Sequence, residues 1–247
     1  MTAPALIALA YGPHDRRATA TGRQVVGEIK RQRPDLRVEA AFLGSAKPAL
    51  ETVVERLERA GVEEAVVVPL LLLDTDQTRT GIPEAMAAIS AAHPGIQMTT
   101  TPVLGLDGVY LEVLDRRMRE ALRASRVREL DALVLAATGS SDTLANQAVA
   151  RAARIWGQAH RLPCVAAYAC SAPPATGEAV RSLRAAGRRH IAVAQLFLTE
   201  GPLYDRAAEL ALEAGAVAVS APLGADPEVA RTVLARYCVG AVELVPV

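Results

Sequence analysis

Uninterrupted apolar runs alternate along this chain with longer segments in which apolar residues recur every three or four positions. The run at residues 5–10 is closed by Gly12 and is typical of a parallel strand buried on both faces. Residues 18–31 show helical spacing and stop before Pro34. Strands are expected at residues 5–10, 37–43, 65–73 and 96–103, and helices at residues 18–31, 50–60, 83–92 and 109–124.

The second half of the chain repeats the first. Residues 6–12 (LIALAYG) match residues 133–139 (LVLAATG) at an offset of 127. Several blocks that match in one order at nearly one offset indicate an internal duplication. The further matching blocks pair residues 39–48 with 165–174, 57–61 with 183–187, and 102–107 with 221–226.

This pattern predicts an α/β fold. Strands that alternate with helices form parallel sheets that are covered by helices on both faces. Together with the duplication, this predicts two tandem domains, at residues 1–126 and 127–247. The boundary is expected where the polar segment 125–129 separates a predicted helix from a predicted strand.

The charge balance excludes one large class of function. The chain has 27 Lys+Arg and 27 Asp+Glu, so its formal net charge is zero, whereas a nucleic-acid binder needs a basic surplus to neutralise phosphates. Aromatic residues make up only 3% of the chain, too few for a base-stacking platform. We therefore expect no nucleic-acid partner and an aliphatic core.

Segments that direct a protein to a membrane or across it are not expected. No basic segment precedes the first apolar run, which ends at Tyr11 and Gly12, so it does not resemble a signal peptide. The longest apolar run, residues 65–73, is too short to cross a bilayer. The three cysteines lack metal-site spacing. These features predict a cytoplasmic protein with no membrane partner.

The predicted topology indicates where a ligand would bind. Open parallel sheets bind ligands beyond the carboxyl ends of their strands, in loops that lead into helices. Two duplicated domains also predict a cleft between them as a small-molecule site. The loops expected to line it are residues 11–16, 44–47, 74–82, 138–143, 170–174 and 199–205.

Two motifs in these loops each have two interpretations. Residues 139–142 (GSSD) either offer backbone N–H groups to an anion or start a helix that is capped by Ser141 or Asp142, and capping preferences favour the helix start. Asp74 and Asp76 either bind a hard cation together or are solvated loop residues, and the usual exposure of aspartate favours solvation.

The four histidines occupy different predicted environments. His93 and His160 end predicted helices, where a histidine stabilises the C-terminus. His190 lies beside two arginines just before a strand and is expected to be exposed. Only His14 lies in a loop after a strand, within reach of the predicted cleft, where it is either functional or a surface turn residue.

Five segments together carry a family resemblance: LIALAYGPHDRRA, VEAAFLGSAKPAL, AGVEEAVVVPLLLL, TRTGIP and LVLAATGSSD. They resemble the long, two-domain sirohydrochlorin chelatases, which are related to the cobaltochelatases of cobalamin biosynthesis. The resemblance implies two flavodoxin-like domains and a lyase that inserts Fe²⁺ or Co²⁺ into a tetrapyrrole, for siroheme or cobalamin. It also implies a metal that is a substrate, no tightly bound cofactor, and a monomer or homodimer.

The residues that carry the chemistry in that family are substituted in this chain. The family pattern has His-Gly after the first strand, Glu after the second, and His-Val-x-x-Asp-Ile-Pro after the third. Here Tyr11 precedes Gly12, Gly44 replaces the acid, and Gln77 and Gly81 replace the second His and the Asp. A phenol is a weak base at neutral pH, and an amide does not titrate there.

Three interpretations of these substitutions stay open. In the first, the protein is a chelatase with a rebuilt site, because imidazole suits iron and cobalt and is a good base at neutral pH. In the second, it is a degenerate paralogue that binds a tetrapyrrole or a partner without inserting metal. In the third, it is a structural or assembly protein without a ligand.

The rebuilt site assigns roles to particular residues. The substrate is rich in carboxylates, which arginines near the loops would bind. The catalytic candidates are Tyr11, His14 and Gln77, and the metal-binding candidates are His14, Asp74 and Asp76. The substrate-binding candidates are Gly12, Arg16, Arg79, Thr138, Gly139, Ser140 and Arg206.

Overall fold

The computed structural model describes residues 3–12, 15–75 and 77–244 of the chain, without the side chains of residues 12 and 77. The chain folds into two compact units. Unit 1 consists of Met1–Gly105 together with Ala225–Val247, and unit 2 consists of Leu106–Gly224. Each unit is built around one four-stranded parallel sheet, called sheet 1 and sheet 2 here.

Sheet 1 has the strand order β2-β1-β3-β4. Its central strand, β1, pairs with β2 from Leu6↔Val38 and with β3 from Ala5↔Ala65. The apolar residues of β1 and β3 are almost completely buried, because helices cover both faces of the sheet. The strands are β1 (Ala5–Gly12), β2 (Val38–Gly44), β3 (Glu64–Pro69) and β4 (Gln97–Thr100).

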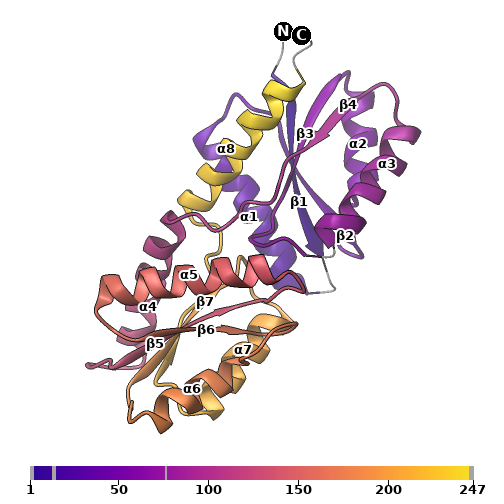
Figure 1. Ribbon diagram of the computed structural model, residues 1–247. Helices are drawn as coiled ribbons and strands as arrows, with labels where there is room; N and C mark the ends of the chain where they lie inside the picture. Colours follow the sequence, from indigo (N-terminus) through magenta and orange to yellow (C-terminus); the bar gives the residue numbers. More distant parts are fainter. Residues whose placement is uncertain (1–2, 13–14, 76, 245–247) are drawn as a thin grey trace. The chain divides into compact units, whose positions relative to one another are not determined.

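Five helical segments belong to unit 1. On one face of sheet 1, α2 and α3 pack with residues such as Val54, Leu57 and Met86 against Ile7 and Val67. On the other face, α1 and α8 pack beside each other (Figure 1). The helices are α1 (Arg16–Gln32), α2 (Leu50–Arg59), α3 (Ile82–Ala92) and α8 (Pro227–Glu243), and a π-helical turn, η1 (Gln77–Gly81), leads into α3.

Unit 2 repeats this arrangement with the strand order β6-β5-β7-β8. In Figure 1, α4 and α5 lie on one face of sheet 2, and α6 and α7 lie on the other. The strands are β5 (Ala132–Ala137), β6 (Cys164–Tyr168), β7 (Ile191–Leu196) and β8 (Ala218–Val219). The helices are α4 (Val109–Ala124), α5 (Thr143–His160), α6 (Thr176–Ala185) and α7 (Pro202–Glu213).

The last helix of each sequence repeat packs in the other unit. After β4 the chain passes Gly105 and enters unit 2, where α4 covers sheet 2, and after β8 it passes Gly224 and returns to unit 1, where α8 covers sheet 1. Both glycines have positive φ, +79° and +68°, a conformation that glycine adopts without steric cost. Packing therefore divides the chain at residues 105 and 224, whereas the sequence repeat divides it at 126.

The expected fold class is confirmed, and two expected strands are shorter. The two parallel sheets flanked by helices match the predicted tandem α/β architecture. The strand expected at residues 65–73 ends at Pro69, and the one expected at 96–103 covers only Gln97–Thr100, followed shortly by Pro102. Proline removes a backbone donor and so limits a strand. Among the described residues, no helix combines the length and apolarity that crossing a membrane requires.

Candidate functional site

The carboxyl ends of β1 and β2 lie side by side at one edge of sheet 1. Tyr11 pairs with Leu43, and Gly12 pairs with Gly44. The Tyr11 side chain is 48% exposed, so its phenol is available to a ligand. Gly44 has φ +96°, a backbone conformation that an acidic residue would strain. The backbone at this strand end therefore suits glycine.

A second group of polar residues follows β3, in the segment that leads into η1. The Thr75 N–H donates to Thr78 Oγ1 over 2.9 Å, and that hydroxyl lies 2.7 Å from the Thr75 carbonyl and 3.2 Å from Asp74 Oδ1. Asp74 and Thr78 line a hollow of about 330 Å³ that also includes residues 100–103 after β4. The Asp74 carboxylate is exposed, so it can meet a ligand at this hollow.

The η1 turn leads past this hollow into α3, whose first residues, Ile82 and Pro83, also line it. A π-helical turn is rare and is frequently found at functional sites. Arg79 lies on η1 and is exposed, and Pro83 follows at the start of α3. Periodicity in the sequence gave no signal for the turn, because a five-residue element is too short to show a repeat.

Several predicted residues lie outside the described part of the chain. His14 and Asp76 fall outside the described residues, and the Gln77 side chain is likewise not described. Of the predicted metal-binding residues, Asp74 has a described position. Within residues 3–12, 15–75 and 77–244, no group of three or more His, Cys, Asp or Glu side chains has the arrangement of a metal site.

Two arginines at the start of α1 differ in their bonding: Arg17 pairs with Asp15, whereas Arg16 does not. Asp15 is the N-cap and accepts from the Arg17 N–H over 2.8 Å. The Arg17 guanidinium folds back onto the same carboxylate, with Nη2 2.7 Å from Oδ2, and these hydrogen bonds lower the pKa of the Asp15 carboxyl. Arg16 is exposed and makes no hydrogen bond or ion pair with any described residue. It therefore stays available for an anionic ligand.

In unit 2, the loop after β5 is held closely against the end of β6. Gly139 has φ +85°, and a Cβ at this position would lie 2.0 Å from the Cys170 carbonyl oxygen, so glycine is required. The preceding Thr138 carbonyl accepts from the Cys170 N–H over 3.0 Å. This is the closest backbone approach among the predicted substrate-binding positions, and it leaves no space for a side chain.

The amides of that loop are already bonded within it. The Ser140 N–H donates to Asn146 Oδ1 over 3.0 Å, and the Asp142 N–H donates to the buried Ser140 Oγ over 3.0 Å. Asp142 caps α5 by accepting from the Leu144 N–H. The helix-start interpretation of residues 139–142 is therefore confirmed for Asp142, and the amides of Ser140 and Asp142 donate to side chains of the chain itself.

The remaining substrate-binding candidate, Arg206, and the other three histidines have described positions. Arg206 is exposed on α7, two residues after Tyr204, whose hydroxyl donates to the Ser220 carbonyl over 3.2 Å. His93 is the C-cap residue of α3, as expected, and its Nδ1 lies 2.7 Å from Glu58 Oε2. His160 is the last residue of α5 and bonds Asp115. His190 is exposed, as expected.

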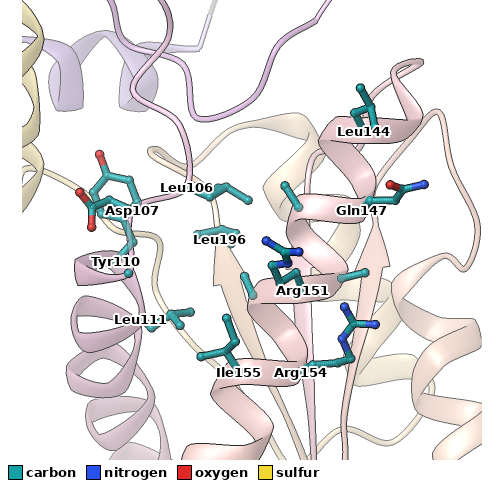
Figure 2. A pocket seen from close by; sticks show the side chains of 14 residues that line it. Leu106, Asp107, Tyr110, Leu111, Leu144, Gln147, Arg151, Arg154, Ile155 and Leu196 are labelled. Carbon is teal, nitrogen blue, oxygen red and sulfur yellow. The ribbon is translucent and has the colours of Figure 1, made fainter.

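A larger hollow lies in unit 2 between the beginning of α4 and residues of α5 from Leu144 to Ile155, and we call it the α4–α5 hollow. It has a volume of about 700 Å³. Figure 2 shows Ile155 on α5 facing Leu111 on α4, with Arg151 above them and Leu196 between the helices, whereas the Arg154 side chain points away from α4. Sequence reasoning missed it, although Arg151 and Ile155 differ in character from their counterparts in the first repeat, Gln24 and Glu28.

Comparisons with known proteins identify relatives over both halves of the chain. The family model described as CbiX matches residues 5–121 and again residues 132–239. The sirohydrochlorin cobaltochelatase of Priestia megaterium is 23% identical over 175 residues, which are 70% of this chain and 57% of that protein. The chain thus matches little more than half the length of this relative.

Solved structures share the fold over the full chain. SirB from Bacillus subtilis with Fe³⁺ superimposes with a TM-score of 0.81 and 20% identity, covering 98% of this chain and 96% of that one. The sirohydrochlorin chelatase SirB from Bacillus subtilis subspecies spizizenii in complex with cobalt superimposes with a TM-score of 0.79 and 20% identity, covering 98% and 97%.

Proposed function

We propose, since the chain belongs to the CbiX family, that it is a chelatase that inserts a divalent metal ion into a sirohydrochlorin-like tetrapyrrole. The metal is Fe²⁺ or Co²⁺ and is a substrate. The observation that carries this proposal is the match of the family to both halves of the chain. The relatives named as sirohydrochlorin chelatases or as complexes with iron or cobalt support the choice of substrate and metal.

The reaction sets two requirements for the residues near the substrate. The metal ion replaces two pyrrole protons, so the protein must hold the incoming ion weakly and must give the two departing protons an acceptor. Asp74 suits both requirements, because its exposed carboxylate lies at the hollow after β3 and can ligate a cation or accept a proton. Tyr11, at the neighbouring strand end, would orient the macrocycle through its exposed phenol.

Recognition of the substrate needs positive charge around an apolar surface. Exposed Arg16, Arg79 and Arg206 would bind side-chain carboxylates of the tetrapyrrole. Gly12, Thr138, Gly139 and Ser140 would let it approach the backbone at the strand ends. Roles for His14, Gln77 and Asp76 in ligation or proton transfer are part of the same proposal. Absence of a tightly bound cofactor and a monomeric or homodimeric state stay predictions.

A second candidate function is tetrapyrrole binding without metal insertion. It is favoured by the substitutions at the positions where the family has its titratable residues. Tyr11, Gly44, Gln77 and Gly81 stand at these positions, and none of these residue types is a good base at neutral pH. The positive φ of Gly44 shows that the backbone there suits glycine.

An anaerobic absorbance experiment separates the two functions. Sirohydrochlorin is first titrated with the protein alone, and Co²⁺ or Fe²⁺ is then added and the loss of the metal-free spectrum is followed. A chelatase accelerates this loss well above the rate without protein. A binding protein changes the spectrum on titration but leaves the insertion rate unchanged. An unchanged spectrum on titration contradicts both functions.

Variants then test the rebuilt site. We expect Asp74→Asn to lower the insertion rate at least about tenfold, because the amide neither accepts a proton nor ligates strongly. His14→Ala should lower it as well, whereas His93→Ala should leave it unchanged, because His93 caps α3 and bonds Glu58. Equal rates in the two histidine variants would contradict a role for His14.

A further inference from the structure

The helices α4 and α5 are joined by hydrogen bonds near the C-terminus of α5. Trp156 Nε1 donates to Asp115 Oδ1 over 2.7 Å, and His160 Nε2 lies 2.7 Å from the same oxygen. Trp156 is only 2% exposed, so this contact fixes the two helices there. The α4–α5 hollow is lined by the first turn of α4 and by residues of α5 from Leu144 to Ile155, with Leu196 at the end of β7 between the helices (Figure 2).

The corresponding positions of unit 1 are packed differently. The carbonyl of Pro227, the first residue of α8, accepts a hydrogen bond from Gln32 on α1 over 3.0 Å. Ala230 on α8 is completely buried, whereas Leu111, its counterpart in α4, is partly exposed and lines the hollow. The two repeats therefore differ at this position.

The residues on the α5 side have also changed between the repeats. Arg151 and Ile155 stand where α1 has Gln24 and Glu28, at the offset of 127. Ile155 is 52% exposed, which is unusual for a large aliphatic side chain that serves only the core. An arginine and an exposed isoleucine one turn apart thus replace the ordinary polar surface of the first repeat.

The hollow combines apolar walls with positive charge. Leu106, Leu111, Ile155 and Leu196 form its apolar part, and Arg151 on α5 supplies a guanidinium group. Arg154 also lines the hollow, with its guanidinium turned away from α4. Neither arginine makes a hydrogen bond or ion pair with any described residue. Asp107 also lines the hollow, but its carboxylate accepts from the Val109 N–H at the start of α4.

This chemistry fits a ligand with an apolar face and several carboxylates. Guanidinium groups pair with carboxylates through two parallel hydrogen bonds, and the aliphatic side chains remove apolar surface from water. A volume of about 700 Å³ is typical of small-molecule sites. A carboxylate-substituted tetrapyrrole has this combination of properties, whereas a free metal ion has no use for the apolar walls.

We propose that the α4–α5 hollow binds one carboxylate-bearing edge of the tetrapyrrole, with Leu111 and Ile155 contacting its apolar edge. Arg151 pairs with one carboxylate, and the exposed Arg154 side chain rotates toward the ligand to pair with another. This inference rests on the proposed function, which names the substrate class, and it adds the residues of unit 2 that recognise it. These arginines bind substrate, so they lower the dissociation constant and take no part in proton transfer.

The test compares two variants in the sirohydrochlorin titration without metal. Arg151→Gln with Ile155→Glu installs the two residue types that α1 carries at the matching positions, on exposed faces where a folded helix tolerates them. We expect this double variant to bind sirohydrochlorin at least about tenfold more weakly than the wild type. Arg123→Gln, an exposed arginine in the last turn of α4, is the control and should bind as the wild type does.

A second readout locates the bound ligand. Hydrogen exchange of the wild type should slow on binding in residues 106–112 and 144–156, and the double variant should lose this protection. Arg154→Ala provides an independent variant and should also weaken binding, by about fivefold to tenfold, with an unchanged thermal midpoint of unfolding.

The outcomes separate this inference from the proposed function. If the wild type binds and the double variant binds equally well without protection of α5, the hollow is not the site and the inference is wrong, while the proposed function stands. If the wild type itself does not bind sirohydrochlorin, the proposed function fails and this inference with it. Weaker binding by both hollow variants but not by Arg123→Gln supports the inference.

Discussion

At the residue scale, the cysteines show how one side-chain type acquires different chemistry from its surroundings. Cys164 starts β6, and burial raises the pKa of its thiol to about 12. Cys238 lies on α8 and is exposed. Both thiols are free of disulfide bonds. Only the thiolate is nucleophilic, so the two side chains should differ in reactivity by far more than their exposure alone suggests.

We therefore expect iodoacetamide at pH 8 to alkylate Cys238 and leave Cys164 unmodified until the protein is unfolded. With a pKa of about 12, only about one Cys164 thiol in 10,000 is ionised at this pH. Peptide mass spectrometry with and without guanidinium measures both sites. Alkylation of Cys164 in the folded protein at a rate similar to Cys238 would contradict the burial.

The same shift has a consequence for stability. Because the folded state raises the thiol pKa from 9.0 to about 12, its contribution to stability is complete below pH 9 and is lost as the pH rises toward 12.

At the scale of single elements, α8 depends on one glycine. A Cβ at Gly240 would lie 2.6 Å from Val66 Cγ1 and 2.8 Å from Thr101 Cγ2, so the helix backbone packs directly on sheet 1. Gly27 on α1 offers a contrast, because a Cβ there meets nothing within 4 Å. Glycine is costly inside a helix unless packing requires it.

Gly240→Ala should lower the free energy of unfolding by about 1–3 kcal/mol, since the steric clash outweighs the gain in helix propensity of about 1 kcal/mol. Gly27→Ala should raise it by about 0.5–1 kcal/mol, because only the gain in propensity acts there. Urea denaturation followed by circular dichroism measures both variants. A stabilising effect of Gly240→Ala would show that α8 does not pack this closely.

At the scale of the whole molecule, the chain passes between the two units twice, because α4 belongs to unit 2 and α8 belongs to unit 1. The first is at Gly105 and the second at Gly224. Unit 1 is closed by α8, which covers the face of sheet 1 that α2 and α3 leave open. Unit 1 is therefore not one continuous chain segment, although the sequence repeat alone suggests two consecutive, independent domains.

A fragment of residues 1–126 should consequently fail to fold. It lacks α8, which exposes apolar residues of β1 and β3, and it carries α4 without the sheet that α4 covers. Joining residues 1–105 to residues 225–247 through a short flexible linker should restore cooperative thermal unfolding, because this fragment contains all of unit 1. Calorimetry of both fragments tests the expectation. Cooperative unfolding of residues 1–126 would contradict it.

The fold class could be predicted because its signals are local. The apolar run of β1 and the helical spacing of α1 are both readable within a few residues. The partner of α4 could not be predicted, because periodicity shows that a helix has an apolar face and does not show which sheet buries it. For the site, the expected strand order predicted that Tyr11 and Asp74 lie at the carboxyl ends of strands. The α4–α5 hollow depends on the distance between two helices, and no local sequence pattern encodes that distance.

The return of α8 to unit 1 also sets an order of events on the ribosome. Sheet 1 is synthesised early, but the helix that completes its cover follows residues 106–224. At about 5–20 residues synthesised per second, the face of sheet 1 that α8 covers stays exposed for on the order of ten seconds until that helix is made. During translation the nascent chain thus exposes an apolar sheet surface for longer than a repeat that closed on itself would.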